Sequence, residues 1–504
     1  MHQIEGKTRR NGGKTRSGAV RASLRRVIRT RTVAATIGAA GAAAVVVGVP
    51  AAHARDVALL SNVSPRQISG GSREANDVTG FVSSGGIEYA ILGVERGFAF
   101  FDLGDPEAPR EVAVLPAPAS IWGDAATFGD YAYLVKDYPP GVIGEGLAMA
   151  DLSRIDEGIV ELTGHLTAEG MTRAHNVRVN PASGTLYVCG ANNHGLTMFD
   201  LGDPAHPVLT GFWNDAYVHD AFLASYPQSD GSFREIGYLA CGGQGLAIVD
   251  LTDPAAPVTL SRYFYDGLAY CHQVWVDPEG RYAYVGDEID EIANPGVFGP
   301  TTYVMDVTDP SHPQIVRLLQ GEVESIDHNM WGRWGYLFQA NYTSGLQIWD
   351  IRDPADPREA GSYDTFPEND SRGFHGAWGV YPDLPSGIVL VSDIESGLFV
   401  FDCSPATGIP IVPFDPAALS YGARVYPNPV LAGAQIRYRL PRSAPVRLRI
   451  LDASGRSVTT LVDGEVGEGW RQVEWDPSGL PSGVYFARLE SVLGARSARM
   501  VVVR

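Results

Sequence analysis

A unit of about 50 residues recurs along the chain, and this repeat restricts the fold more than any other feature of the sequence. Each copy is an apolar stretch that ends in Asp and is followed within a few residues by Asp-Pro-x-x-Pro. Clear copies follow Asp102, Asp200, Asp250, Asp306 and Asp350, and weaker copies lie at Asp151 and Asp402. The mean spacing of these seven aspartates is 50 residues. A repeat of this length with only strand signals inside it predicts the blades of a β-propeller.

The interior of each unit favours strands. Segments 131–135, 185–189 and 345–350 are short, rich in aromatic and β-branched residues, and bounded by Gly, Asn or Pro. No segment sustains the apolar period of a long amphipathic helix. We interpret the Asp-Pro pair as a turn, in which the Asp side chain accepts a hydrogen bond from the backbone two residues later and Pro presets φ.

The repeat predicts a seven-bladed propeller in an all-β chain. Seven units open near Asn76, Ile121, His175, His219, His272, His328 and His375. The seventh unit ends after its third strand, at Asp402. We expect segment 57–61 to supply the missing outer strand and to close the ring, which leaves no open edge.

Histidines recur at the start of the units, and they are the leading candidates for a functional site. Five of the eleven histidines have this phase: His175, His219, His272, His328 and His375. If the units close into a ring, these imidazoles converge on its axis. Asp287 and Glu288, at a strand end of the fifth unit, join them as predicted metal ligands. Such a donor set suits a divalent transition metal.

The residues next to the histidines allow a more detailed hypothesis. Neighbouring side chains of a strand point in opposite directions, so we assign the histidines to the axis. Asp220 and Asp327 are then expected to orient the rings from outside the ligand set. Two alternatives remain open. The histidines can simply bond to water and neighbouring blades, or Asp287 and Glu288 can bind Ca²⁺ together with backbone carbonyls.

Four tryptophans lie near the start of repeat units, close in sequence to the positions that the histidines occupy: Trp122, Trp275, Trp331 and Trp378. They suit a pocket for a sugar, a peptide or another ligand with an apolar face. Packing between blades is an equally good explanation for them.

Three segments resemble a known family. Asp-His-Asn-Met-Trp at 327–331, the long segment 336–350 and Ser-Asp-Ile-Glu-Ser-Gly-Leu-Phe-Val at 392–400 resemble the LVIVD-repeat proteins of the choice-of-anchor B family. The resemblance covers residues 56 to 405. It implies a secreted or surface-held bacterial propeller with interchangeable C-terminal anchors, and it implies no particular reaction.

The N-terminus has the pattern of a signal peptide. Ten Lys or Arg side chains precede an uncharged stretch at 33–52 and a small-x-small site that ends at Ala54. We therefore predict a signal peptide over 1–54 and a mature chain without a transmembrane span. Arg25-Arg26 leaves twin-arginine export open beside the general route. A membrane anchor is the weaker alternative, because the stretch consists largely of Ala and Gly.

Residues beyond the propeller form a separate module. The propeller is expected over 55–408, a Pro-containing linker over 409–420, and a small sandwich of alternating strands over 421–504. Tyr-Pro-Asn-Pro at 426–429, Ser-Gly-Val-Tyr at 482–485 and the final strand at 500–504 resemble the C-terminal sorting domains of type IX secretion. This resemblance implies an immunoglobulin-like fold and the type IX machinery as a partner.

The charge of the chain disfavours some kinds of partner, and its cysteine content disfavours a disulfide framework. Without residues 1–54 the chain has 29 basic and 57 acidic side chains, which disfavours nucleic acid and anionic membranes as partners. The four cysteines are too few for a disulfide framework, although a bridge between Cys189 and Cys241 is one alternative to buried thiols.

These observations predict an exported propeller at the cell surface that binds a ligand or partner at its histidine-rich axial face and is not an enzyme. The alternative is a metal-dependent hydrolase in which Glu288 or Asp287 acts as a general base. A structural adhesin without metal is the third hypothesis. No nucleophile elbow or phosphate-binding loop supports a specific reaction.

Overall fold

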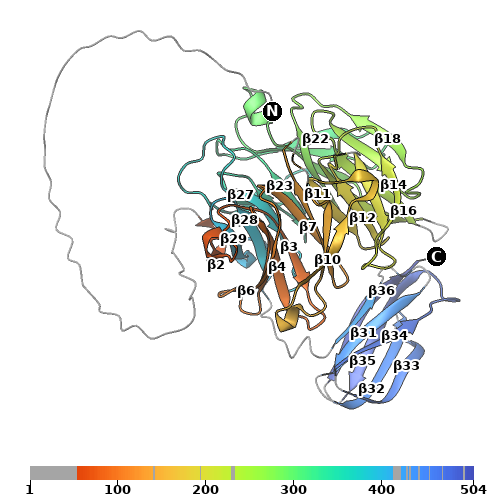
Figure 1. Cartoon of the computed structure of the whole chain (residues 1–504). Coiled ribbons are helices and arrows are strands. Elements are labelled where there is room, and N and C mark those ends of the chain that lie inside the picture. Colours follow the sequence, from red (N-terminus) through yellow and green to blue (C-terminus); the bar gives the residue numbers. More distant parts are fainter. Residues whose placement is uncertain are drawn as a thin grey trace, which may run out of the picture. The chain divides into compact units, whose positions relative to one another are not determined.

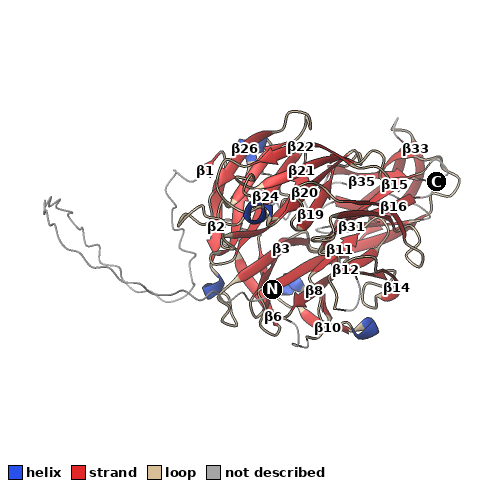
Figure 2. Cartoon of the chain, turned by 90° about the horizontal axis from the view of Figure 1, so that it is seen from above, coloured by secondary structure: helices blue, strands red, loops and turns tan. Residues whose placement is uncertain are grey.

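The computed structural model describes residues 54–503, except 140, 141, 143, 193–194, 229–232, 412–421, 427–429, 431–432, 441–442, 453–454, 468 and 492–493. The predicted signal peptide, apart from Ala54, and most of the predicted linker lie outside the described residues. The regular secondary structure of the described chain is almost entirely β-strand (Figures 1 and 2).

Seven antiparallel sheets occur in the described part of residues 54–402. The first sheet contains β3 (Ala75–Val82), β4 (Glu88–Val94), β5 (Gly97–Asp102) and β6 (Arg110–Pro116). The second contains β7 (Trp122–Phe128), β8 (Tyr131–Asp137), β9 (Leu147–Asp151) and β10 (Glu161–Leu166). The third contains β11 (Asn176–Asn180), β12 (Thr185–Cys189), β13 (Leu196–Asp200) and β14 (Val208–Trp213). The fourth sheet contains β15 (Asp220–Pro227), β16 (Phe233–Ala240), β17 (Leu246–Asp250) and β18 (Val258–Tyr263). The fifth contains β19 (Cys271–Val276), β20 (Tyr282–Asp287), β21 (Thr301–Asp306) and β22 (Gln314–Gln320).

The last two sheets take strands from both ends of this region. One contains β23 (Asn329–Arg333), β24 (Tyr336–Ala340), β25 (Leu346–Asp350) and β26 (Arg358–Tyr363), with β1 (Ala54–Arg55) added to β26. The other contains β27 (Ala377–Tyr381), β28 (Val389–Asp393), β29 (Gly397–Asp402) and β2 (Ala58–Val63). The pairing of β2 with β29 supplies the outer strand that was expected from segment 57–61.

The first strands of the sheets contact one another in a closed cycle. β3 contacts β7, each following first strand contacts the next one along the chain, and β27 returns to β3. Four-stranded sheets arranged around a common centre in this way form a β-propeller. The predicted all-β propeller is therefore confirmed.

The repeat aspartates end the third strand of every sheet, from Asp102 at the end of β5 to Asp402 at the end of β29. Asp102 Oδ1 accepts a hydrogen bond from Gly104 N at 2.8 Å, and Asp105 Oδ1 accepts one from Glu107 N at 3.1 Å. The turn interpretation of the Asp-Pro repeat is confirmed, because each Asp satisfies a backbone donor two residues later.

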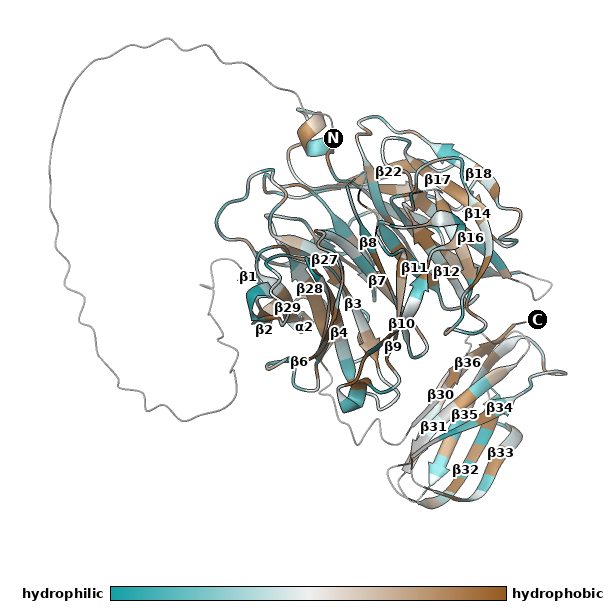
Figure 3. Ribbon diagram, in the orientation of Figure 1, coloured by the Kyte–Doolittle hydropathy of each residue, from teal (hydrophilic) through white to brown (hydrophobic). Residues whose placement is uncertain are grey.

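Burial explains why the strands are apolar on both faces. All of β4 is buried, and the core clusters join neighbouring sheets, as where Leu92 and Phe101 meet Leu390 and Val400. Hydrophobic residues accordingly concentrate in the strands (Figure 3). All four cysteines are buried and free, so the Cys189–Cys241 bridge is absent. Burial raises the pKa of the Cys189 thiol well above its usual value.

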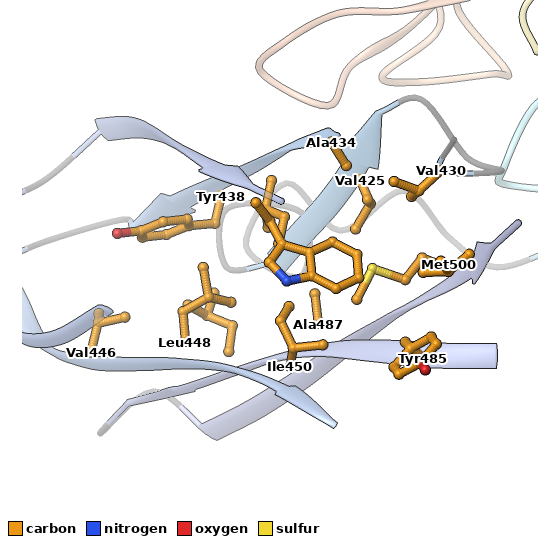
Figure 4. Packing of buried hydrophobic residues seen from close by; sticks show 14 of the residues in the cluster. Val425, Val430, Ala434, Tyr438, Val446, Leu448, Ile450, Tyr485, Ala487 and Met500 are labelled. Atoms are coloured by element: carbon orange, nitrogen blue, oxygen red, sulfur yellow. The ribbon is translucent and has the colours of Figure 1, made fainter. Parts of the chain in front are cut away.

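The C-terminal module has two sheets of its own. The first contains β30 (Gly422–Tyr426), β31 (Ala434–Leu440) and β34 (Gly469–Trp475), and the second contains β33 (Ser457–Val466), β32 (Ala444–Asp452), β35 (Gly483–Ser491) and β36 (Gly494–Val502). Side chains from both sheets share one core, in which Leu448, Ile450 and Met500 pack together with Tyr438 (Figure 4). Along β32, buried and exposed side chains alternate, as predicted for half-buried strands.

Helices are short in the described chain. They are η2 (Pro65–Gln67), η3 (Ile155–Glu157), η4 (Ala168–Gly170), α1 (Asp290–Ala293) and α2 (Ser404–Thr407). Among the described residues, no helix has the length and apolar character that a membrane crossing requires.

Candidate metal centre at the propeller axis

Four imidazole rings form a row across four consecutive sheets. The ring centroids of His175 and His219 lie 4.3 Å apart, those of His219 and His272 4.1 Å, and those of His272 and His328 4.4 Å. Each ring stands at or just before the first strand of its sheet, where the sheets meet. The predicted convergence of histidines on a shared centre therefore holds for these four.

His375 is not part of this row. Its side chain is 59% exposed, stacks on Phe366, and places Nδ1 2.6 Å from Glu395 Oε1. The backbone turns between His375 and β27, since Gly376 has a φ of +88°. Trp378 stands in the corresponding place. The backbone carbonyl of Trp378 accepts a hydrogen bond from His328 Nδ1. In the same way, the backbone carbonyl of His272 accepts one from His219 Nδ1.

Bulges explain how a histidine and its neighbour both reach the centre. The register of β19 against β20 shifts between Cys271 and Gln273, which leaves His272 as the extra residue. Gln273 lines a cavity between the first strands, although His272 belongs to the imidazole row. A β-bulge interrupts the alternation of faces, so the expectation that only one of two neighbours points inward is wrong at this strand.

Glu288 completes a group of three potential metal ligands. Its Oε2 lies 3.8 Å from His272 Nε2 and its Oε1 lies 3.9 Å from His328 Nε2. The three ligand atoms all lie within 4.8 Å of one another. Ligands bound to zinc at 2.0–2.2 Å stand roughly 3.4 Å apart in a tetrahedron. Small side-chain adjustments would bring this group to that geometry.

Backbone contacts set the protonation of two of the imidazoles, those of His328 and His219. His328 Nδ1 lies 2.6 Å from the carbonyl of Trp378, and His219 Nδ1 lies 2.8 Å from the carbonyl of His272. A carbonyl only accepts, so each Nδ1 carries a hydrogen and Nε2 of a neutral ring keeps its lone pair. Burial lowers the pKa of His328 to about 3 and lowers the pKa of His219 well below its usual value.

Tyr342 holds the carboxylate of this group. Its hydroxyl donates to Glu288 Oε1 at 2.7 Å, and its ring lies 4.5 Å from the His328 ring. Burial raises the pKa of Glu288. Tyr342 has a φ of +41°, and the corresponding residue of an earlier sheet is Gly242, with a φ of +57°. Sequence reasoning missed this residue, although a large residue aligned with the glycine of an earlier repeat was a usable signal.

The other predicted carboxylates lie elsewhere. Asp287 is fully buried and accepts from Tyr265 Oη at 2.9 Å and from the amides of Ala269 and Tyr270, so its oxygens are occupied. Asp220 pairs with Arg178 at 2.7 Å and accepts from Gln273. The expected contact of Asp220 with a histidine ring is replaced by this buried ionic contact.

Asp327 belongs to a second group of acids. Its carboxylate oxygens, with those of Asp290 and Glu291, offer ligand atoms within 4.8 Å of one another. All three side chains are fully buried. Burial raises the pKa of all three carboxyl groups, and repulsion from neighbouring acids, Asp287 included, adds to this effect. Asp327 therefore does not orient an imidazole through a described hydrogen bond.

The four tryptophans separate into different environments. Trp378 meets the His328 ring edge-on at 4.8 Å. Trp275 is buried in the core between two sheets, and Trp331 donates to Asp383 Oδ2 at 2.9 Å. Trp122 begins β7 and is half-buried. The structure therefore brings only Trp378 of these four into contact with the imidazole row.

Comparison with known families agrees with the fold. The LVIVD repeat matches residues 237–264 and 334–365, which contain the second to fourth strands of two sheets apart from the start of β16. The secretion system C-terminal sorting domain matches residues 424–503. The chain thus carries LVIVD repeats and a C-terminal sorting domain. A sorting domain indicates export to the cell surface or the extracellular space.

Solved structures resemble the LVIVD propeller at low identity. A protein from Lactobacillus plantarum is 12% identical, with a TM-score of 0.45, over 79% of this chain and 99% of that chain. The Cps50 (Swd1) β-propeller domain of Myceliophteria thermophila is 11% identical, with a TM-score of 0.42, over 66% and 98%. The periplasmic gluconolactonase of Pseudomonas aeruginosa is 11% identical, with a TM-score of 0.42, over 79% and 99%. No curated protein matches the chain.

Proposed function

We propose that the chain is an exported, surface-associated propeller of seven blades that binds a divalent transition metal through His272, His328 and Glu288. The open positions of the metal would hold an external ligand, without turnover. The observation that carries this proposal is the meeting of two imidazole Nε2 atoms and one carboxylate within 4.8 Å. In this proposal the C-terminal module is an immunoglobulin-like domain read by type IX machinery, and the protein belongs with the choice-of-anchor B group.

The donor set favours a transition metal. Two neutral imidazoles and a carboxylate suit zinc, iron or manganese better than calcium, which prefers oxygen ligands alone. Three protein ligands also leave coordination positions free for a ligand from outside. The hydrogen bond from Tyr342 to Glu288 supports the proposal, because partners of this kind orient a ligating carboxylate.

The surroundings favour a ligand with a donor atom for the metal and a flat apolar part. The His219 ring lies beside the His272 ring at a tilt of 41°, and Trp378 and Tyr342 flank His328. Aromatic rings provide contact area for sugar or aromatic faces. A neutral His219 can in addition donate or accept a hydrogen bond next to the metal.

Metal titration tests the proposal. The mature protein is stripped with chelator and titrated with Zn²⁺ or Mn²⁺ in a calorimeter, in parallel with the His272→Ala and His375→Ala variants. We expect one tight site in the mature protein and in His375→Ala, and loss of that site in His272→Ala. Equal binding by all three proteins, or no tight binding, would refute the site.

A metal-dependent hydrolase is the second candidate function. It is favoured by His219, whose ring lies 4.1 Å from that of His272. The Nδ1 atom of His219 faces the carbonyl of His272, so its Nε2 keeps a lone pair that can accept a proton. Asp287 is a poor base here, because protein donors already occupy its oxygens. A panel of esters, lactones and phosphoesters separates the two functions, since a binding protein turns over none of them with or without metal.

A further inference from the structure

We propose that Asp290, Glu291 and Asp327 form a second cation site, for a hard divalent cation and first of all Ca²⁺. Two chain segments bring the three carboxylates together: α1 supplies Asp290 and Glu291, and Asp327 stands two residues before β23. Their ligand atoms lie within 4.8 Å of one another, and none of the three side chains is exposed. This site is separate from the metal proposed at His272 and does not depend on it.

Several carboxylate oxygens of this group accept no hydrogen bond from a protein donor among the described residues. Asp290 Oδ2 accepts from Tyr303 Oη at 2.6 Å, and Glu291 Oε1 accepts from the amides of Thr301 and Asp327. The other oxygen of each carboxylate is buried and accepts no hydrogen bond from a nitrogen or hydroxyl group of the described residues. The carboxyl groups of Asp290 and Glu291 themselves come within hydrogen-bond reach of each other. Buried carboxylate oxygens ordinarily find donors, so such vacancies require an explanation.

Asp327 is the independent indication of a ligand. Its side chain is fully buried, and both of its carboxylate oxygens have no hydrogen-bond partner among the described residues. Gly286 gives it room, since a Cβ at that position would stand 2.5 Å from Asp327 Oδ2. The fold therefore accommodates an acidic side chain in a buried position and supplies no protein donor for it.

The chemistry of the group selects a hard cation. Three carboxylates repel one another strongly in a buried environment, and a divalent cation compensates most of their charge. Oxygen ligands without nitrogen or sulfur are those that Ca²⁺ prefers, and flexible coordination by six to eight oxygens tolerates an irregular cage. The imidazole site and the acidic site therefore differ in donor type and in the metal that each prefers.

The position of the group gives the cation a structural role. Glu288 lies two residues before Asp290, and His328 directly follows Asp327. A cation held by the acidic group would tie together the two segments that carry these residues. Because it is buried, the cation would act on stability and would not meet a ligand in solution.

Calcium binding by the mature protein tests the inference. Protein stripped with chelator is titrated with CaCl₂ by calorimetry, and its Tm is measured in CaCl₂ and in chelator. We expect one tight Ca²⁺ site and a higher Tm in CaCl₂, because a ligand that binds only the folded state stabilises it. Asp327→Asn keeps the shape of the side chain but removes its charge, and should lose both the site and the Ca²⁺-dependent rise in Tm.

Two further variants make the test decisive. Glu291→Gln should behave like Asp327→Asn. Glu235→Gln is the matched control, because Glu235 is also buried but accepts from Asn180, Ser183 and Tyr187, and it should keep the Ca²⁺ response. Absence of Ca²⁺ binding by the mature protein overturns the inference and means that the three acids share protons. Equal Ca²⁺ binding by mature protein, Asp327→Asn and Glu291→Gln overturns it as well.

The two metal sites can fail separately. Loss of Zn²⁺ binding in His272→Ala with an intact Ca²⁺ response supports both sites. A mature protein that binds Ca²⁺ but no transition metal refutes the imidazole site alone, and the reverse result refutes the acidic site alone.

Discussion

The hydroxyl of Tyr342 donates a hydrogen bond to Glu288 at 2.7 Å, and Tyr342 itself has a left-handed backbone conformation. Such a conformation costs a non-glycine residue about 1–3 kcal/mol and persists where the surroundings hold it in place. Hydrogen bonds in both directions between the backbones of Tyr342 and Ala377 hold this turn. The chain thus places a tyrosine, at some cost in strain, where its hydroxyl can orient a carboxylate of the candidate metal centre.

Removal of this hydroxyl should weaken metal binding without unfolding the protein. Tyr342→Phe keeps the ring contacts with His328 but leaves Glu288 without its donor. We expect the Kd for Zn²⁺ or Mn²⁺ to rise about 10-fold to 100-fold, as for other contacts that orient a metal ligand. Calorimetric titration measures the change. An unchanged Kd would mean that Tyr342 has no part in the site.

The buried ion pairs at the axis should be far more important for stability than surface pairs. Arg178 contacts Asp124 at 2.6 Å and Asp220 at 2.7 Å, and both acids are buried. Arg178→Met would leave these carboxylates uncompensated, which costs about 3–5 kcal/mol of unfolding free energy. Arg110→Met, which breaks an exposed pair with Asp102, should cost less than about 1 kcal/mol. Urea unfolding compares the two, and equal losses would contradict the prediction.

Lys136 predicts a pH dependence of stability. Burial lowers its pKa to about 7, and the charge of Glu95 opposes this shift. Between this value and the ordinary value of 10.5, the unfolded chain binds the proton and the folded chain does not. The contribution of Lys136 to stability therefore rises as pH increases through this window.

The corresponding measurement is urea unfolding of the mature protein and of Lys136→Met at pH 7.5 and pH 9.5. The gain in unfolding free energy between these pH values should be larger in the mature protein than in the variant. The opposite order would show that Lys136 keeps its charge in the folded state.

The sequence predicts the fold better than the site. The repeat aspartates mark the end of each third strand, because an Asp that satisfies the backbone two residues later is a local signal. The unit that begins near His375 could not be aligned correctly, because the strand begins two residues later and a bulge spans Trp378. Bulges depend on pairing with a neighbouring strand, and the spacing of histidines does not record them.

In the candidate site, too, features set by nearby sequence could be predicted, and features set by distant segments could not. Four of the five predicted histidines converge, since each one lies next to the start of a strand at the centre of the ring. Asp287 and Glu288 are neighbours in sequence, yet protein donors occupy Asp287 and only Glu288 reaches the imidazoles. The donors of Asp287 come from segment 265–270, so the sequence alone gives no reason to prefer one acid over the other.

Diffraction at a metal absorption edge, from crystals of the mature protein grown with Zn²⁺, tests the central claim most directly. The account predicts an anomalous peak within bonding distance of His272 Nε2, His328 Nε2 and the Glu288 carboxylate. A well-ordered axis without such a peak, or zinc bound only at other residues such as His375, would contradict it.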